Sequence, residues 1–380
     1  MPHNPMRVVT VPIQSHSPGC EKVCCAGYIR VEAVLNPLRN DPAFMNTEIN
    51  PIFSADNFFH DPEIFRPALM QALRLTTKLI DATLPFFHTI LWGKTVVLQE
   101  ETADLRKRIQ FVDEGTELTE HSRRLTQADL KRFAGRIVFK FDDESGCSGC
   151  ELEIDPKTGK DRAVISLNRA VYDETLNAYW NGTDAAHDAW IQTRVAVTLG
   201  HELVHAIMSL THGNNIEAYF GDSQVAEEGF EWEKRTFGGT FYLEDKKSCY
   251  YQIHTTPSEL KGTLVLEDWP CLKEVETYER EGWAIGVRGD VPKVNIRWNV
   301  SISHFLNLLQ ESWWETEYAR RGPAALRPPK VTGARYMTKG AALVPYYIED
   351  DEEGLADTVP RGYEALQQGL VVPADGPADL

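Results

Sequence analysis

The stretch "TLGHELVHAIMSLTHG", residues 198–213, places two histidines four residues apart, with a glutamate directly after the first. Most of its other residues are apolar or uncharged, which is typical of a buried helix. Burying two imidazoles and a carboxylate without partners would cost on the order of several kcal/mol. We therefore expect something to bind these three side chains, and a metal ion can do so.

The spacing of the two histidines suits a zinc site. On a helix, residues i and i+4 lie about 40° apart around the axis and ~6 Å apart along it, so His201 and His205 can bind one ion. Glu202 lies roughly 100° round from His201, where it can accept a proton from a water molecule that zinc activates. The HExxH pattern also occurs by chance in long chains, but the uncharged flanks favour a buried metal site.

The segment "TLGHELVHAI", residues 198–207, resembles the active-site helix of the zincin metallopeptidases. This resemblance implies that His201 and His205 bind one catalytic Zn²⁺ and that Glu202 activates water. It also implies an α+β fold, in which a mixed or antiparallel sheet packs on the active-site helix, with largely helical N- and C-terminal additions. Together with "EEGFEWE" further on, the segment resembles uncharacterised zincin-like proteins of fungi, which implies no known substrate.

A catalytic zinc usually has three protein ligands, so one more is required. His212 follows His205 by seven residues and would lie ~10 Å further along a continuous helix, out of reach of the same ion. The metzincin branch solves this with a helix-breaking glycine and an earlier histidine. Met208 and Thr211 occupy those positions here, so the metzincin pattern fails.

The stretch "DSQVAEEGFEWEKRTFGG", which begins at Asp222, offers a better third ligand. In the gluzincin branch of zincins, the third ligand is a glutamate on a second helix, and an acid four positions later orients a ligand histidine. That resemblance favours Glu227 as the ligand and Glu231 as the orienting acid, with Glu228 as the alternative ligand. An acidic surface helix is the other interpretation, but the aromatic residues between the acids indicate partial burial.

Hydrophobic periodicity predicts the surrounding elements. A helix begins near Pro62 and continues to Pro85, and another covers residues 185–213. Residues 136–143 have the composition of a strand, and "ELEID" and "RAVISLN" flank a turn as a hairpin. In zincins an edge strand before the active-site helix pairs with extended substrate, and "RAVISLN" is the candidate here. A further docked helix is expected from Ser301 to Gly322.

These elements divide the chain into five predicted segments. They are an N-terminal arm (1–60), a helical region (61–135), a zincin-like catalytic core (136–245), a C-terminal subdomain (246–348) and an acidic, loosely ordered tail (349–380).

Composition limits the classes of partner. The 380 residues carry a formal net charge of −17, which would repel nucleic acid and anionic membranes and favours a peptide or small amide as substrate. No apolar run approaches the ~18 residues of a membrane span, and the N-terminus lacks the pattern of a signal peptide. We therefore expect a cytoplasmic protein.

Seven cysteines are an odd number, which fits reduced thiols better than a disulfide framework. Two clusters could together supply thiolates to a structural zinc ion, or could lie in loops without such a role. The clusters are Cys20, Cys24 and Cys25, and Cys147 and Cys150. For the group that stabilises the oxyanion, the sequence offers Tyr336, Tyr346, Tyr347 and His254 without a choice between them.

The leading hypothesis is a zinc metallopeptidase or related metallohydrolase, which cleaves a peptide or related amide bond. His201, His205 and Glu227 bind the ion, and Glu202 is the general base. The alternatives are an inactive zincin-fold scaffold or binding protein, a zinc enzyme that tailors a small natural product, and a non-haem iron site with the same His, His, Glu set.

Overall fold

The protein's structure is a computed structural model, and it describes the following residues: 41–59, 62–98, 107–112, 117–142, 149–168, 185–213, 216–245, 262–270, 275–276, 286–292, 294–300, 302–330, 332–339, 342–349, 363–365 and 371–373. Helices and several small sheets are both present in this part of the chain. The fold class is therefore α+β, as expected.

The described helices differ widely in length, and the longest, α8, carries the HExxH stretch. They are α3 (Pro42–Met45), α4 (Pro62–Ala82), α5 (Leu84–Trp92), α6 (Glu120–Phe133), α8 (Ala185–His212), α9 (Glu228–Phe237), α11 (Ile302–Leu308), α12 (Glu311–Trp313) and α13 (Ala319–Arg321). Short 3-10 turns are η2 (Pro51–Phe53), η3 (Ala55–Asn57) and η6 (Gly322–Leu326), and η5 (Trp314–Tyr318) is a π-helical turn.

The described strands form several separate sheets. One has the order β3-β5-β4, from β3 (Ile137–Asp142), β5 (Asp161–Asn168) and β4 (Gly149–Ile154). A second has the order β1-β2-β6, from β1 (Thr95–Leu98), β2 (Lys107–Phe111) and β6 (Ile216–Phe220). The largest is antiparallel, with the order β13-β12-β11-β9-β8, from β13 (Ala342–Glu349), β12 (Thr332–Lys339), β11 (Val294–Asn299), β9 (Gly262–Glu267) and β8 (Thr240–Asp245). Two pairs complete the set: β7 (Val225–Ala226) with β10 (Gly286–Val287), and β14 (Tyr363–Ala365) with β15 (Val371–Pro373).

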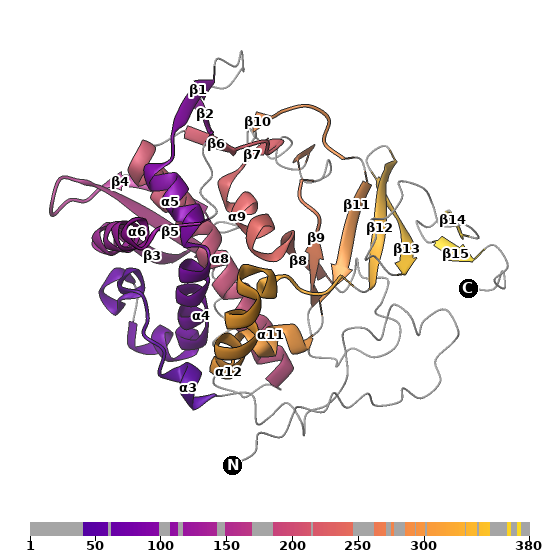
Figure 1. Cartoon of the computed structure of the whole chain (residues 1–380), viewed down its shortest axis with the longest axis horizontal. Coiled ribbons are helices and arrows are strands. Elements are labelled where there is room, and N and C mark those ends of the chain that lie inside the picture. The colour runs from indigo at the N-terminus through magenta and orange to yellow at the C-terminus, as the bar shows by residue number, and fades with distance from the viewer. Residues whose placement is uncertain are drawn as a thin grey trace.

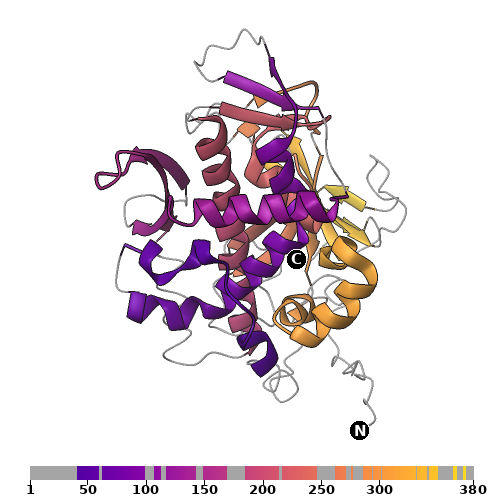
Figure 2. The same cartoon turned by 60° about the vertical axis from the view of Figure 1, so that its left-hand side comes forward.

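Helix α8 runs through the middle of the molecule (Figures 1 and 2). The sheet β3-β5-β4 lies on one side of it, and α9 and the five-stranded sheet lie on the other (Figure 1). One main hydrophobic core extends from Phe44 to Leu326 and takes residues from four of the five predicted segments. The boundaries of those segments stay a prediction.

The contact between α8 and α4 depends on a buried amide. The side chain of Gln192 accepts a hydrogen bond from the backbone N–H of Ala72 (2.9 Å) and donates one to the carbonyl of Ala68 (2.8 Å). Because both polar ends of the amide are bonded, its burial is not destabilising. The helix ends at His212, before Gly213, whose φ of 101° is left-handed. The predicted helix over residues 185–213 is thus confirmed.

Helix α9 packs against α8 through an aromatic side chain. Trp232 is fully buried, and its Nε1 donates a hydrogen bond to Thr83 Oγ1 (2.9 Å). A Cβ on Gly200 of α8 would lie only 2.2 Å from the indole ring, so this close packing requires glycine there. The position of α9 matters because this helix carries the acids that the sequence places near the histidines.

The sheet beside α8 corrects one prediction. The hairpin of β4 and β5 forms as expected, but "RAVISLN" (β5) lies in the centre of its sheet, because β3 pairs with its other side in parallel. It therefore has no open edge for a substrate. The edge strands of this sheet are β3 and β4, and among the described strands β4 pairs with β5 alone.

The predicted single helix from Ser301 to Gly322 is also wrong, because it is broken after α11. Gln310 is extended (φ −117°, ψ 123°), and α12 begins after it. The backbone N–H of Glu311 donates to Asp41 Oδ2 (2.7 Å), and its carboxylate contacts Lys78 Nζ (2.7 Å). These long-range contacts hold the start of the second helix, which a local pattern cannot reveal.

Some predictions fall outside the described residues. These concern the first 40 residues of the arm and the side chains of Cys20, Cys24, Cys25, Cys147 and His254. In the described part of the chain, no helix is both long and apolar enough to cross a lipid bilayer.

Candidate metal centre

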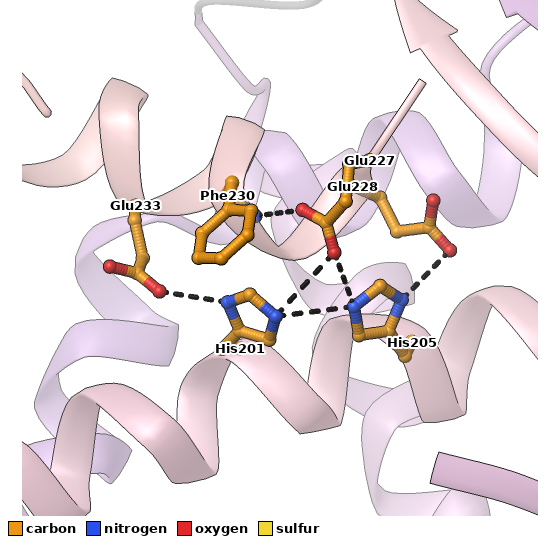
Figure 3. Close-up of polar contacts among 6 residues, drawn as sticks. All are labelled: His201, His205, Glu227, Glu228, Phe230 and Glu233. Carbon is orange, nitrogen blue, oxygen red and sulfur yellow. Dashed lines mark hydrogen bonds and ion pairs between the residues drawn. The ribbon is translucent and has the colours of Figure 1, made fainter. Parts of the chain in front are cut away.

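The two histidines of the HExxH stretch lie side by side on α8 (Figure 3). The imidazole centroids of His201 and His205 are 5.0 Å apart, and their Nε2 atoms are 3.3 Å apart. Glu202, between them in sequence, is 5% exposed. The helix therefore directs both Nε2 atoms to one point, as the i, i+4 spacing predicts.

Glu227 comes to the same point from α9 (Figure 3). Its Oε1 lies 2.7 Å from His205 Nε2 and 3.5 Å from His201 Nε2. Its other oxygen, Oε2, accepts a hydrogen bond from the backbone N–H of Phe230 and caps the helix. The cap holds the carboxylate still while one oxygen faces the imidazoles. An acid is also favoured at this helix end by the helix dipole.

Glu228, the alternative third ligand, takes a different place. Its Oε1 lies 3.1 Å from His205 Nδ1, on the far side of the imidazole from Glu227. On the first histidine, Glu233 Oε1 lies 2.7 Å from His201 Nδ1, and its Oε2 accepts a hydrogen bond from the N–H of Phe241 (2.9 Å). Each imidazole thus has a carboxylate at its Nδ1 atom. This carboxylate fixes the orientation of the ring, so that Nε2 faces the other predicted ligands.

Glu231, the predicted orienting acid, does not contact either histidine in the contacts that the structure describes. Its Oε1 instead accepts a hydrogen bond from Arg235 Nε (2.7 Å). The reason is helix phase, because α9 begins at Glu228 and turns about 100° per residue. Gly229 and Glu233 share the face toward His201, and Glu231 is roughly 200° away from Gly229.

The carboxylates change the protonation of the imidazoles. Burial alone lowers the pKa of His201, but the charge of Glu227 and the hydrogen bonds to Glu227 and Glu233 outweigh it and raise the pKa to about 10. The pKa of His205 is likewise raised, by Glu227 and Glu228 against the effect of burial. Burial would raise the pKa of Glu227, yet the two imidazoles hold it well below its usual range. Without a metal, protons supply the positive charge of this site.

The geometry fits a zinc ion. Ligand atoms held by a tetrahedral zinc lie about 3.4 Å from one another, since each bond is about 2.0–2.2 Å long. Two separations agree with this value: 3.3 Å between the Nε2 atoms, and 3.5 Å between His201 Nε2 and Glu227 Oε1. The third, 2.7 Å, is a direct hydrogen bond from His205 to Glu227, which the ion would have to replace. Among the described residues, His201, His205 and Glu227 are the group that could hold a metal ion.

Glu202 is buried beside this group, and its burial raises the pKa of the carboxyl group. The charges of His201 and His205 act in the opposite direction. A carboxylate with a raised pKa accepts a proton more readily than an exposed one, which suits a general base. Its role as general base stays a prediction.

Several other predicted residues are not members of this group or stay untested. His212 contacts the carbonyl of Ile90 through Nε2 (2.8 Å) and packs edge-on against Phe111. Cys150 on β4 is a free thiol, and burial raises its pKa to about 12. A zinc site made of cysteines stays a prediction, because the other four cysteines of the two clusters lie outside the described residues. The side chains of Tyr336, Tyr346 and Tyr347, on β12 and β13, are likewise not described.

Sequence reasoning missed Gly229, Phe230 and Glu233 as members of the site. A Cβ on Gly229 would lie 2.5 Å from His201 Nε2, and the Phe230 ring meets the His201 ring at 4.7 Å. The i, i+4 spacing of Gly229 and Glu233 predicts that they share one face of a helix. It indicates that this face meets His201 only when the start of the helix is known.

Comparison of the chain with protein family models, with characterised proteins and with solved structures finds no match. Conclusions about function therefore depend on the residues of the site itself.

Proposed function

We propose that the protein is a zinc-dependent hydrolase of peptide or related amide bonds, with a zincin-like catalytic core. One observation carries the proposal: two imidazole Nε2 atoms and one carboxylate oxygen lie 2.7–3.5 Å apart, with a buried glutamate beside them. His201, His205 and Glu227 would hold the ion. When bound, zinc would supply the Lewis acidity that polarises an amide carbonyl and makes water a better nucleophile.

Glu202 would move the protons of the reaction. It takes a proton from the attacking water and then delivers it to the nitrogen of the leaving amine, so that the C–N bond can break. Burial favours both steps, because it raises the pKa of the carboxyl group toward the working range of a general acid and base. Glu228 and Glu233 would fix the orientation of the imidazoles through their contacts with the Nδ1 atoms.

Strand β4 would position an extended substrate. It is one of the two edge strands of its sheet in the described part of the chain, and it packs against α8. The charges of His205 and Glu202 act on the thiol of Cys150 in this strand, which supports a position of the strand near the residues that we propose for catalysis. A peptide that added to the edge would satisfy its backbone groups by pairing with β4.

Metal analysis and turnover together test the proposal. Protein purified without added metal is expected to contain about one zinc per chain, and zinc-loaded protein is expected to cleave a mixed peptide pool. Glu202→Gln should keep its zinc and lose turnover by about 10²–10⁴-fold. The exposed Glu120 on α6 gives a matched control, since Glu120→Gln should change neither zinc content nor turnover.

The outcomes separate the competing functions. Zinc without turnover on any peptide would indicate a binding or scaffold protein, or an enzyme for small amides. Iron in place of zinc would indicate the alternative of a non-haem iron site with the same His, His, Glu set. Cleavage that survives Glu202→Gln would contradict the mechanism.

A further inference from the structure

Phe230 lies at the metal centre but holds no metal. Its ring packs edge-on against the His201 ring, with centroids 4.7 Å apart and planes at 75° (Figure 3). Its backbone N–H donates a hydrogen bond to Oε2 of Glu227, so the backbone that carries this ring is held to the predicted ligand. The ring is therefore in direct contact with one of the predicted ligands.

The ring belongs to a small apolar cluster separate from the main core. Its buried members are Val225, Trp269, Val275 and Val291. Phe230 packs on Trp269 at 4.6 Å and, unlike those four, is only partly buried. Trp232 and Phe237 of the same helix are completely buried in the main core. Phe230 therefore keeps some accessible surface, and its ring is in contact with the ring of His201.

The three predicted ligands are not completely buried. The side chains of His201, His205 and Glu227 keep 13%, 25% and 14% of their surface exposed. A bond cleaved at the predicted ion would lie close to Phe230, because the ring of Phe230 contacts the ring of His201, one of the predicted ligands. Ligand sites commonly combine an apolar wall with a few polar groups that orient the ligand, and this arrangement has both.

Charge restricts the substrate further. Three carboxylates contact the two imidazoles, from Glu227, Glu228 and Glu233, and Glu202 is buried nearby. One divalent ion would not neutralise all of them. A substrate carboxylate beside the cleaved bond would therefore enter a field of its own sign, and repulsion at close range in a partly buried site is strong.

We propose that Phe230 is the contact surface for an apolar side chain next to the cleaved bond. The substrates are then peptides or amides with an aromatic or branched aliphatic residue beside that bond and no acidic residue at the adjoining position. This inference rests on the proposed function, because it requires a zinc ion at His201, His205 and Glu227.

Hydroxamates test the inference without turnover, because they bind zinc directly and carry one side chain. Calorimetry on the zinc-loaded chain would compare the hydroxamates of phenylalanine, alanine and aspartate. We expect phenylalanine hydroxamate to bind at least tenfold more tightly than alanine hydroxamate, and aspartate hydroxamate to bind most weakly. In Phe230→Ala, the preference for phenylalanine over alanine should fall below about threefold. Zinc content should not change, since the backbone N–H of residue 230, which donates to Glu227, remains in this variant.

A peptide assay gives the second measurement. Peptides that differ only in the residue beside the cleaved bond should show a preference for phenylalanine and leucine over alanine in kcat/KM. Phe230→Leu should keep the preference for apolar residues and lose most of the advantage of aromatic ones. These variants change the ratio between substrates, which loss of folding would not do.

The results distinguish the two proposals. Equal binding of the three hydroxamates, or an unchanged preference in Phe230→Ala, would overturn the role of Phe230 and leave the zinc hydrolase standing. Absence of zinc or of any hydroxamate binding would overturn the metal centre itself. Graded hydroxamate binding without peptide cleavage would support the apolar contact and contradict peptide hydrolysis.

Discussion

Gly229 lies so close to His201 that a Cβ added to it would come within 2.5 Å of the imidazole Nε2. That nitrogen faces Glu227 and is the predicted zinc ligand atom. The first turn of α9 can therefore approach α8 only because residue 229 has no side chain. This close contact between the two helices lies at the predicted metal centre.

Gly229→Ala is expected to prevent zinc binding while the fold stays intact. The methyl group must displace either His201 or the first turn of α9, and either movement separates the ligand atoms. Calorimetric titration with zinc should show a loss of affinity of at least about 100-fold, since ligand geometry sets the affinity. Gly135→Ala is the matched control, because nothing lies within 4 Å of a Cβ there, and zinc affinity should not change. Normal zinc binding by Gly229→Ala would show that this contact does not define the site.

Glu233→Gln should weaken zinc binding by about 10–100-fold, as expected for an acid that orients a ligand histidine. The carboxylate accepts from His201 Nδ1 (2.7 Å), and an amide in its place lacks the negative charge that supports the imidazole. Glu231→Gln, on the opposite face of α9, should leave the affinity within about twofold. If the two variants weakened zinc binding equally, a general loss of negative charge would explain the result better than orientation of His201.

Metal-free protein is expected to lose stability as the pH rises from about 6.5 to 10. The folded-state pKa of His201, about 10, is above its ordinary value of 6.5, so its stabilising contribution is complete below pH 6.5 and disappears as the pH passes through 10. Glu202 and Glu233, whose pKa values burial raises, act in the same direction from pH 4.5 upward. Thermal unfolding in the presence of a chelator should therefore show Tm falling over this range. A Tm that stays constant or rises would contradict the raised pKa of His201.

Trp232→Ala should destabilise the protein by about 3–5 kcal/mol, the usual cost of removing a fully buried aromatic side chain. The indole fills the space against Gly200 and donates to Thr83, so its removal loosens α9, which carries Glu227. Chemical denaturation would measure the loss, with zinc absent. Trp92, which is 54% exposed, provides the control, and Trp92→Ala should cost about 1 kcal/mol or less.

The amino-acid sequence by itself determined the parts of this protein that depend on local periodicity. The 3.6-residue period predicts the helix over residues 185–213, and the i, i+4 spacing brings His201 and His205 to one point. The alternating pattern likewise predicts the hairpin of β4 and β5. These features require only the geometry of one segment, which its own residues encode.

The tertiary structure decided which groups from other segments come to that point. Whether Glu227, Glu228, Glu231 or Glu233 reaches the histidines depends on where α9 begins and on how it packs on α8, because one residue changes the direction of a side chain by about 100°. The open edge of β4 depends on β3, which pairs with β5 rather than with β4. Contacts between distant segments set these relationships, and no local pattern contains them.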